Sequence, residues 1–147
     1  MIRKLLFASV LMLGAPAAYA QACSVNLEGN DAMKYNLKNI DVPKSCKDFT
    51  INLKHTGKLP RNAMGHNVVV GATKDIAAID RDGIKAGLTS EYIKAGDTRV
   101  IAASKVIGGG QSTSVTFPVA KLTGGPYSFF CSFPGHSTLM KGTITLK

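Results

Sequence analysis

Apolar and polar residues alternate along much of this chain, with the period of two that half-buried β-strands show. Elsewhere several consecutive positions are apolar, as in Val68-Val69-Val70, a pattern typical of a more deeply buried strand. Together these patterns predict strands over residues 23–28, 49–54, 66–73, 113–119, 127–131 and 143–147. Clusters of glycine and proline separate the predicted strands, at residues 57–60, 108–110 and 124–126.

One segment, residues 74–88, departs from this period. Its apolar residues recur near helical spacing, and Asp75 stands where it can cap a helix. We therefore expect one short helix between strands, interrupted near Gly83. Many short strands joined by turns predict an all-β fold, arranged as an antiparallel sandwich or barrel with this one helical insertion.

The first 20 residues have the pattern of a secretory signal peptide. Arg3 and Lys4 precede a short apolar run, and Ala18-Tyr19-Ala20 forms a cleavage site of small residues. We predict cleavage after Ala20, which leaves residues 21–147 as a single domain. No later segment supplies the roughly 20 apolar residues that span a bilayer, so stable membrane insertion is not expected. Lipid attachment at Cys23 is an alternative, although the residues before it match a lipoprotein signal poorly.

The chain is basic, with 18 lysines and arginines against nine acidic residues and a net charge of +9. Without Arg3 and Lys4 of the predicted signal, 16 basic residues remain and the net charge is +7. The lysines are scattered, with no long run and no interleaved aromatic residues. This pattern favours solubility and attraction to an acidic partner, and it gives little support to nucleic-acid binding.

The chain has three cysteines, and disulfide bonds use cysteines in pairs, so an exported form would keep one unpaired thiol. Cys23 and Cys46 both lie in the N-terminal third, and pairing them would close a loop of about 24 residues, worth roughly 3 kcal/mol of stability. Cys131 would then be free. A free thiol that survives in an oxidising compartment needs a reason, and burial and metal ligation are the two candidates.

The segment CSFPGHSTLM brings a thiol, an imidazole and a thioether into one tight loop. Four residues separate Cys131 from His136, three separate His136 from Met140, and a Pro-Gly pair forces a turn. A second imidazole, His66, lies 65 residues upstream, where a predicted strand begins. If that strand neighbours the one that ends at Cys131, His66 can meet the loop.

This set of ligand types selects a metal. A trigonal set of two histidines and a cysteine, with a weak axial methionine, is the blue-copper electron-transfer arrangement. Zinc would more often take a further cysteine, histidine or carboxylate in place of the methionine. Each residue alone has an ordinary explanation, since a lone cysteine or methionine usually fills a core. Their joint spacing predicts one copper ion that cycles between Cu(I) and Cu(II).

The segments GHN at residues 65–67 and FCSFPGHSTLMKG at residues 130–142 closely resemble the azurin group of the bacterial periplasmic cupredoxins, a family of blue-copper proteins. The likeness covers nearly all of residues 21–147. It implies a Greek-key sandwich of about eight strands, a periplasmic location and the shuttling of single electrons between redox partners. One departure is the absence of tryptophan, because Val68 stands where many members carry one.

The resemblance also implies a role for each residue of the site. His66, Cys131 and His136 would be the equatorial copper ligands. Met140 would be the weak axial ligand, with the backbone carbonyl of Gly65 opposite it.

Three further residues take implied roles around these ligands. Asn67 and the backbone of Phe133 would donate hydrogen bonds toward the cysteine sulfur and tune the reduction potential. His55, at a predicted strand end, is expected to be structural and not a ligand.

In the resembling family one histidine ligand reaches the surface through an apolar patch. Here that histidine would be His136, and the docking patch would consist of Met33, Met64, Phe133, Pro134 and Leu139. The implied partners are c-type cytochromes, nitrite reductase, a peroxidase or amine dehydrogenases. The net charge favours a partner with an acidic docking face.

Two other functions are compatible with the sequence. Cys131 could be the nucleophile of a hydrolase or transferase, with His136 as its base and Asn67 or Asp97 as the orienting residue. That interpretation leaves Met140 and the tight loop unexplained. The protein could also bind copper without redox cycling.

Overall fold

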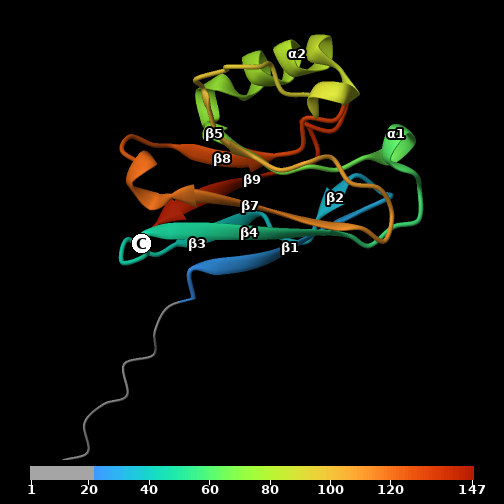
Figure 1. Ribbon diagram of the computed structural model, residues 1–147. Helices are drawn as coiled ribbons and strands as arrows, with labels where there is room; N and C mark the ends of the chain where they lie inside the picture. Colours follow the sequence, from blue (N-terminus) through green and yellow to red (C-terminus); the bar gives the residue numbers. More distant parts are fainter. Residues whose placement is uncertain (1–21) are drawn as a thin grey trace, which may run out of the picture.

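In the computed structural model, which describes residues 22–147, the chain forms two facing β-sheets with a helix outside them (Figure 1). The all-β sandwich expected from the sequence is confirmed, with nine strands in this part of the chain where about eight were expected. Within residues 22–147, no helix has the length and apolar character needed to cross a membrane. The predicted signal peptide, residues 1–20, lies outside the described residues.

The first sheet has the strand order β2-β1-β4-β7. Its strands are β1 (Ser24–Asn30), β2 (Lys34–Tyr35), β4 (Asp48–His55) and β7 (Ser112–Pro118). On β4 and β7 every second side chain is buried, as the alternation in the sequence predicted. Phe49 and Phe117 lie directly opposite each other on these strands, with ring centroids 6.0 Å apart, and anchor the core between the sheets.

The second sheet has the order β3-β9-β8-β5-β6. Its strands are β3 (Asn39–Val42), β5 (Val69–Ala72), β6 (Val100–Ala103), β8 (Tyr127–Phe130) and β9 (Lys141–Leu146). The antiparallel arrangement expected from the sequence holds for most neighbouring strands but not for two pairs, because β1 pairs in parallel with β4, and β3 pairs in parallel with β9. An alternating pattern reports which face of a strand is buried and carries no information about the direction of its neighbour.

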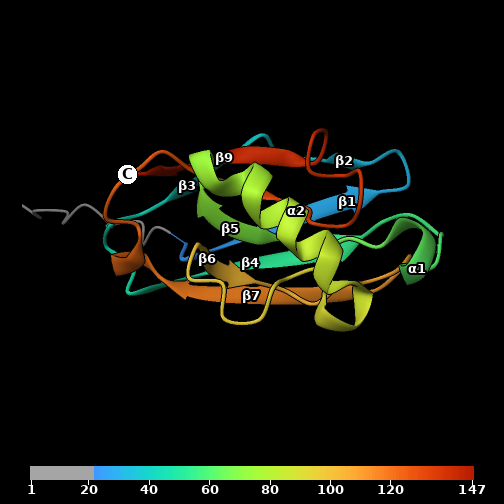
Figure 2. The ribbon, with the colours of Figure 1, turned by 90° about the horizontal axis from the view of Figure 1, so that it is seen from above.

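The continuous apolar run on β5 is explained by burial on both faces of its sheet. Val70 and Phe129 are register partners that point into the core between the sheets. Val69 and Phe130, the next pair along, point outward and pack against Ile79 of the helix α2 (Ile76–Ala86). Figure 2, seen from above, shows α2 lying across this sheet.

The helix differs in one respect from the sequence prediction. No interruption occurs at Gly83, since α2 runs through it. Gly83 is buried, and a Cβ at this position would collide with the carbonyl oxygen of Tyr92, so only a glycine fits here. Asp75 occupies the N-cap position, but its side chain makes no capping hydrogen bond. Shorter helical turns occupy Arg61–Met64 (α1), Thr73–Asp75, Leu88–Ser90 and Val119–Lys121.

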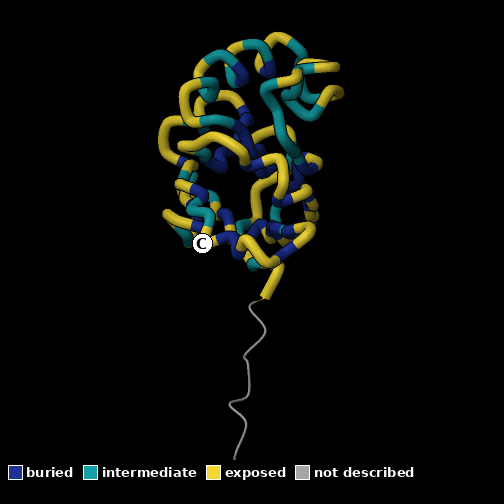
Figure 3. Tube along the Cα trace, turned by 90° about the vertical axis from the view of Figure 1, so that its left-hand side faces the viewer, coloured by how far each residue is buried: buried dark blue, intermediate teal, exposed yellow. Residues whose placement is uncertain are grey.

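Burial and one disulfide bond fix the N-terminal part of this frame. Buried and exposed positions alternate along the strands, and exposed positions gather at the turns (Figure 3). Cys23 and Cys46 form a disulfide bond with a Cα–Cα distance of 5.7 Å, which confirms the predicted pairing. Cys131 is free and fully buried, so it is available for another role.

Candidate metal centre

Three side chains with metal-binding atoms converge just beyond β5 and β8. One donor atom each from His66, Cys131 and His136 lies within 4.8 Å of the other two. His66 and Cys131 are 0% exposed, and His136 is 2% exposed. The set contains two imidazoles and one thiol and no carboxylate, which is the donor chemistry expected for a soft metal ion.

The pairing of β5 with β8 brings the first two residues together. These strands are antiparallel neighbours, so the segment that enters β5 lies beside the segment that leaves β8. His66 precedes β5, and Cys131 directly follows β8. His66 is also fixed by two backbone hydrogen bonds with Ile107, of 2.9 and 2.8 Å. The strand neighbourhood on which the sequence hypothesis depended is therefore present.

Backbone hydrogen bonds close the loop that carries the third residue. The amide of Cys131 donates to the carbonyl of Met140 at 2.9 Å, which joins the two ends of the loop. The amides of Leu139 and Met140 both donate to the carbonyl of His136. Gly135 has a φ of +81°, a left-handed conformation that glycine adopts without a steric penalty. The turn thereby points His136 back toward Cys131.

The outer hydrogen bond of His66 selects which of its ring nitrogens faces the cluster. Its Nε2 donates to the carbonyl of Asn30 at 2.9 Å, which leaves Nδ1 to face the other donors. The Cys131 Sγ lies 3.6 Å from the Nδ1 of His136. The carbonyl oxygen of Gly65 lies 2.9 Å from the His66 Nδ1 and 3.9 Å from the Cys131 Sγ. This carbonyl therefore belongs to the same cluster.

Burial shapes the protonation of all three side chains. It raises the pKa of the Cys131 thiol to about 11, against the opposing effect of the backbone amides of Asn67 and Phe133. It also lowers the pKa of His136 to about 4 and lowers the pKa of His66. The imidazoles are thus neutral, as metal ligands must be, and the thiol requires a cation to replace its proton. These residues fit a copper ion.

Met140 lies beside this cluster and is 0% exposed. A Cβ added at Gly29 of β1 would stand 3.2 Å from the Met140 Cε and 2.8 Å from the His66 Cδ2. The thioether end of Met140 and the ring of His66 therefore approach the same point on β1, where only a glycine leaves room for both.

We expect Gly29→Ala to disturb the metal centre and the fold together. The His66 ring has little freedom to move away from the new methyl group, because its Nε2 is bonded to the Asn30 carbonyl and its face is stacked on His55 at a centroid distance of 4.1 Å. Unfolding of the metal-free protein by denaturant should show a loss of about 1–3 kcal/mol, and Cu(II) titration should show weaker binding. Gly124→Ala is the matched control, since no atom lies within 4 Å of a Cβ there. Equal effects in the two variants would contradict this account.

The side chain of Asn67 connects the two segments that carry the donors. Its Oδ1 accepts a hydrogen bond from the Ser132 amide at 2.9 Å, and its Nδ2 donates to the Ser132 Oγ at 2.8 Å. The same Nδ2 lies 3.1 Å from the carbonyl oxygen of Glu91. Asn67 follows His66 and Ser132 follows Cys131, so these bonds keep the two donors at a fixed separation.

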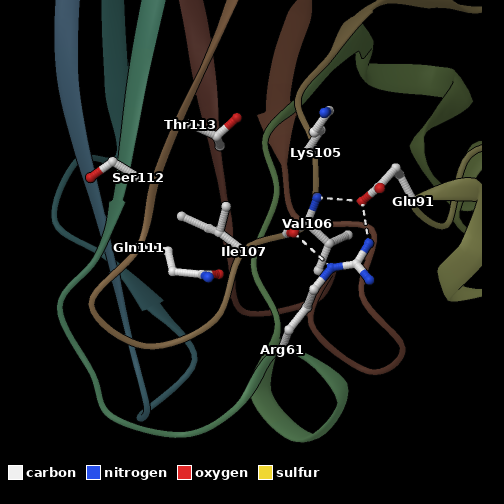
Figure 4. A pocket seen from close by; sticks show the side chains of 8 residues that line it. All are labelled: Arg61, Glu91, Lys105, Val106, Ile107, Gln111, Ser112 and Thr113. Carbon is white, nitrogen blue, oxygen red and sulfur yellow. Dashed lines mark hydrogen bonds and ion pairs between the residues drawn. The ribbon is translucent and has the colours of Figure 1, made fainter.

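A charged network supports this arrangement from outside (Figure 4). The carboxylate of Glu91 accepts hydrogen bonds from the Val106 amide at 2.6 Å and from the Arg61 guanidinium at 2.8 Å. Arg61 also donates through Nε to the carbonyl of Val106 at 2.8 Å. These residues line a pocket of about 700 Å³, and their bonds hold Val106 and its neighbour Ile107, the backbone partner of His66.

His55 lies behind the cluster and not within it. It ends β4, is 0% exposed and stacks on His66. The Gly57 amide donates to its Nδ1 at 3.0 Å, so its Nε2 carries the proton and donates to the Met64 carbonyl at 2.8 Å. Both ring nitrogens are engaged by the backbone, as a structural histidine requires.

The residues of the predicted docking patch differ in exposure. Leu139 is 51% exposed, Pro134 is exposed, and Met33 and Met64 are half-buried. Phe133 is only 7% exposed, and its ring lies 4.7 Å from the ring of His136. Phe133 therefore packs behind the patch and contributes little of its surface.

Sequence reasoning missed three residues that support the cluster, namely Asn30, Glu91 and Ser132. Ser132 directly follows Cys131, and that adjacency was a usable signal. Asn30 acts through its backbone carbonyl, which every residue has, so its side chain gave no sign of this role. Glu91 is distant in sequence from every donor, and only the folded chain brings it near.

The comparisons with known proteins agree with this geometry. A family model described as copper binding proteins, plastocyanin/azurin family, matches residues 21–147. Azurin of Bordetella pertussis is 58% identical over 149 residues, which cover 99% of this chain and 99% of the relative. Azurin of Alcaligenes faecalis is 64% identical over 126 residues, or 85% and 98%. Azurin of Pseudomonas aeruginosa is 52% identical over 148 residues and the full length of both chains.

Proposed function

This chain belongs to the plastocyanin/azurin family of copper-binding proteins and is a blue-copper electron-transfer protein with one copper ion, and from that premise we propose how its own residues hold the ion and pass the electron. His66 and His136 would bind through Nδ1, and Cys131 through its thiolate. Met140 would add its thioether as a weak ligand, and the Gly65 carbonyl would be a second weak ligand. When bound, the copper ion supplies one-electron chemistry by alternating between Cu(II) and Cu(I).

The observation that carries this proposal is the buried cluster of two imidazoles and one thiol. Backbone hydrogen bonds hold each of its members in place, through Ile107 and Asn30 for His66 and through the closed loop for the other two. A site that is rigid before the ion binds moves few atoms when the electron arrives. The barrier to transfer is low for that reason.

Two backbone amides would set the reduction potential. The amides of Asn67 and Phe133 both favour the deprotonated form of Cys131 and lower its pKa, in opposition to burial. A hydrogen bond to the sulfur withdraws electron density that the sulfur would otherwise share with the ion. We expect these two donors to favour the reduced state for this reason.

The geometry gives no support to the alternative of a cysteine hydrolase. Cys131 is 0% exposed, and burial raises the pKa of its thiol to about 11, so the free thiolate that acts as a nucleophile would be scarce. Asp97, one proposed orienting residue, is bound to Arg99 at 2.6 Å. Asn67, the other, bonds to Ser132 and Glu91. An electron carrier without enzymatic activity is the function that these contacts favour.

The location and the partners complete the proposal. The protein would act in the periplasm after cleavage behind Ala20. It would exchange electrons with redox proteins such as c-type cytochromes, nitrite reductase, a peroxidase or amine dehydrogenases. Met33, Met64, Pro134 and Leu139 would face the partner, and scattered lysines would steer one with an acidic docking face.

The direct test is the addition of Cu(II) to the purified metal-free protein. One equivalent should produce an intense blue thiolate-to-copper absorption band that dithionite bleaches and air or ferricyanide restores. A colourless complex would contradict the proposal, and a blue complex that could not be reduced and reoxidised would identify a copper-binding protein without redox cycling.

The role of Met140 as a weak ligand has its own test. Met140→Leu should keep both the copper ion and the blue colour, because three ligands still hold the ion. The reduction potential, measured by spectroelectrochemical titration, should rise, because loss of a weak donor disfavours Cu(II) more than Cu(I). An unchanged potential would show that Met140 only fills space.

A further inference from the structure

Tyr35 is a buried phenol that none of the roles above uses. It lies on the two-residue strand β2, opposite Gly29 of β1, and is 4% exposed. Its ring packs against Phe129 of the other sheet, with centroids 5.6 Å apart. A phenylalanine would fill this space equally well, so the hydroxyl group requires a separate explanation.

The hydroxyl of Tyr35 makes one hydrogen bond of particular interest. It donates to the backbone carbonyl of Asn67, and this bond is buried. Asn67 is the residue whose side chain binds Ser132 through two hydrogen bonds, of 2.9 and 2.8 Å. Tyr35, which lies on the opposite sheet, thus holds Asn67 in place. Asn67 in turn connects the His66 segment to the Cys131 segment.

Burial raises the pKa of Tyr35 well above its usual range, so the hydroxyl keeps its proton. That single proton is committed to the Asn67 carbonyl.

We propose that Tyr35 is a positioning residue of the metal centre, whose hydroxyl fixes Asn67 and thereby the separation of His66 and Cys131. The proposal rests on the proposed function only for its copper-loaded readouts. In the metal-free chain it stands on the hydrogen bond from Tyr35 to Asn67 and on the two that join Asn67 and Ser132.

Tyr35→Phe removes the hydroxyl and keeps the ring. In the metal-free protein, amide hydrogen exchange followed by NMR should become roughly fivefold faster at Ser132, the effect of losing one supporting hydrogen bond. In the copper-loaded protein the thiolate band and the reduction potential should both shift, because His66 and Cys131 are no longer held at a fixed separation. A role in packing alone would move none of these readouts.

Tyr127→Phe is the matched control. Its hydroxyl accepts a hydrogen bond from the Gly124 amide at 2.8 Å, far along β8 from Cys131, and its loss should leave Ser132 exchange, the band and the potential unchanged. Wild-type values for Tyr35→Phe in all three readouts would overturn the proposal. Failure of this variant to fold would also overturn it, since the hydroxyl would then support the whole core. If the wild type gave no blue band, the proposed function would fail, while the exchange experiment would still decide the role of Tyr35.

Discussion

Cys131→Ser should abolish the blue absorption band entirely. A hydroxyl group of similar size cannot supply the soft, anionic sulfur from which the charge-transfer transition arises. The residue is 0% exposed, so the substitution also leaves a polar group in an apolar site, at a cost of about 1–3 kcal/mol. Absorption spectra after Cu(II) addition measure the first effect, and denaturant unfolding of the metal-free protein measures the second.

Thr138→Ala provides the control for this experiment, because Thr138 is exposed on the same loop. It should retain the full band, which would show that a change within the loop is not enough to remove it. His136→Gly is the informative companion, because external imidazole should enter the opening and restore the spectrum. A full-intensity band in Cys131→Ser would refute the assignment of the thiolate as a copper ligand.

Leu139→Lys should slow electron self-exchange by at least roughly tenfold while it leaves the blue band intact. Self-exchange brings two copies together through the same patch, so the substitution places two like charges in one interface, and such contacts cost several kcal/mol. Leu139 is 51% exposed, so the change should not disturb the core. NMR line broadening in mixtures of oxidised and reduced protein measures the rate.

Two comparisons make this result specific to the patch. Ile84→Lys adds the same charge at another exposed apolar residue, 43% exposed on α2, and should leave the rate near that of the wild type. The deficit of Leu139→Lys should also persist at high salt, where long-range steering is screened but the loss of an apolar contact is not. Equal rates in the two lysine variants would mean that electrons leave through another face.

The closeness of Cys131 and His136 on one loop was predicted correctly because it is local. Residues that lie within ten positions on a turn with Pro134-Gly135 must be close in space, whatever the rest of the chain does. The free thiol followed from the odd number of cysteines, and the disulfide bond between Cys23 and Cys46 is confirmed. Alternation also identified the faces of β4 and β7 correctly, because burial of one face imposes a period of two.

The sequence by itself thus determined an all-β frame, a cysteine kept out of disulfide bonds, and a loop with the ligand types of a copper site. Only the tertiary structure decided how His66 meets that loop, because the antiparallel pairing of β5 with β8 joins positions 65 residues apart. It also decided the parallel pairing of β1 with β4 and the uninterrupted helix at Gly83. The tertiary structure also decided how Tyr35 and Glu91 support the site. Hydrogen bonds between distant segments depend on how the sheets pack, and no local pattern in the chain records that geometry.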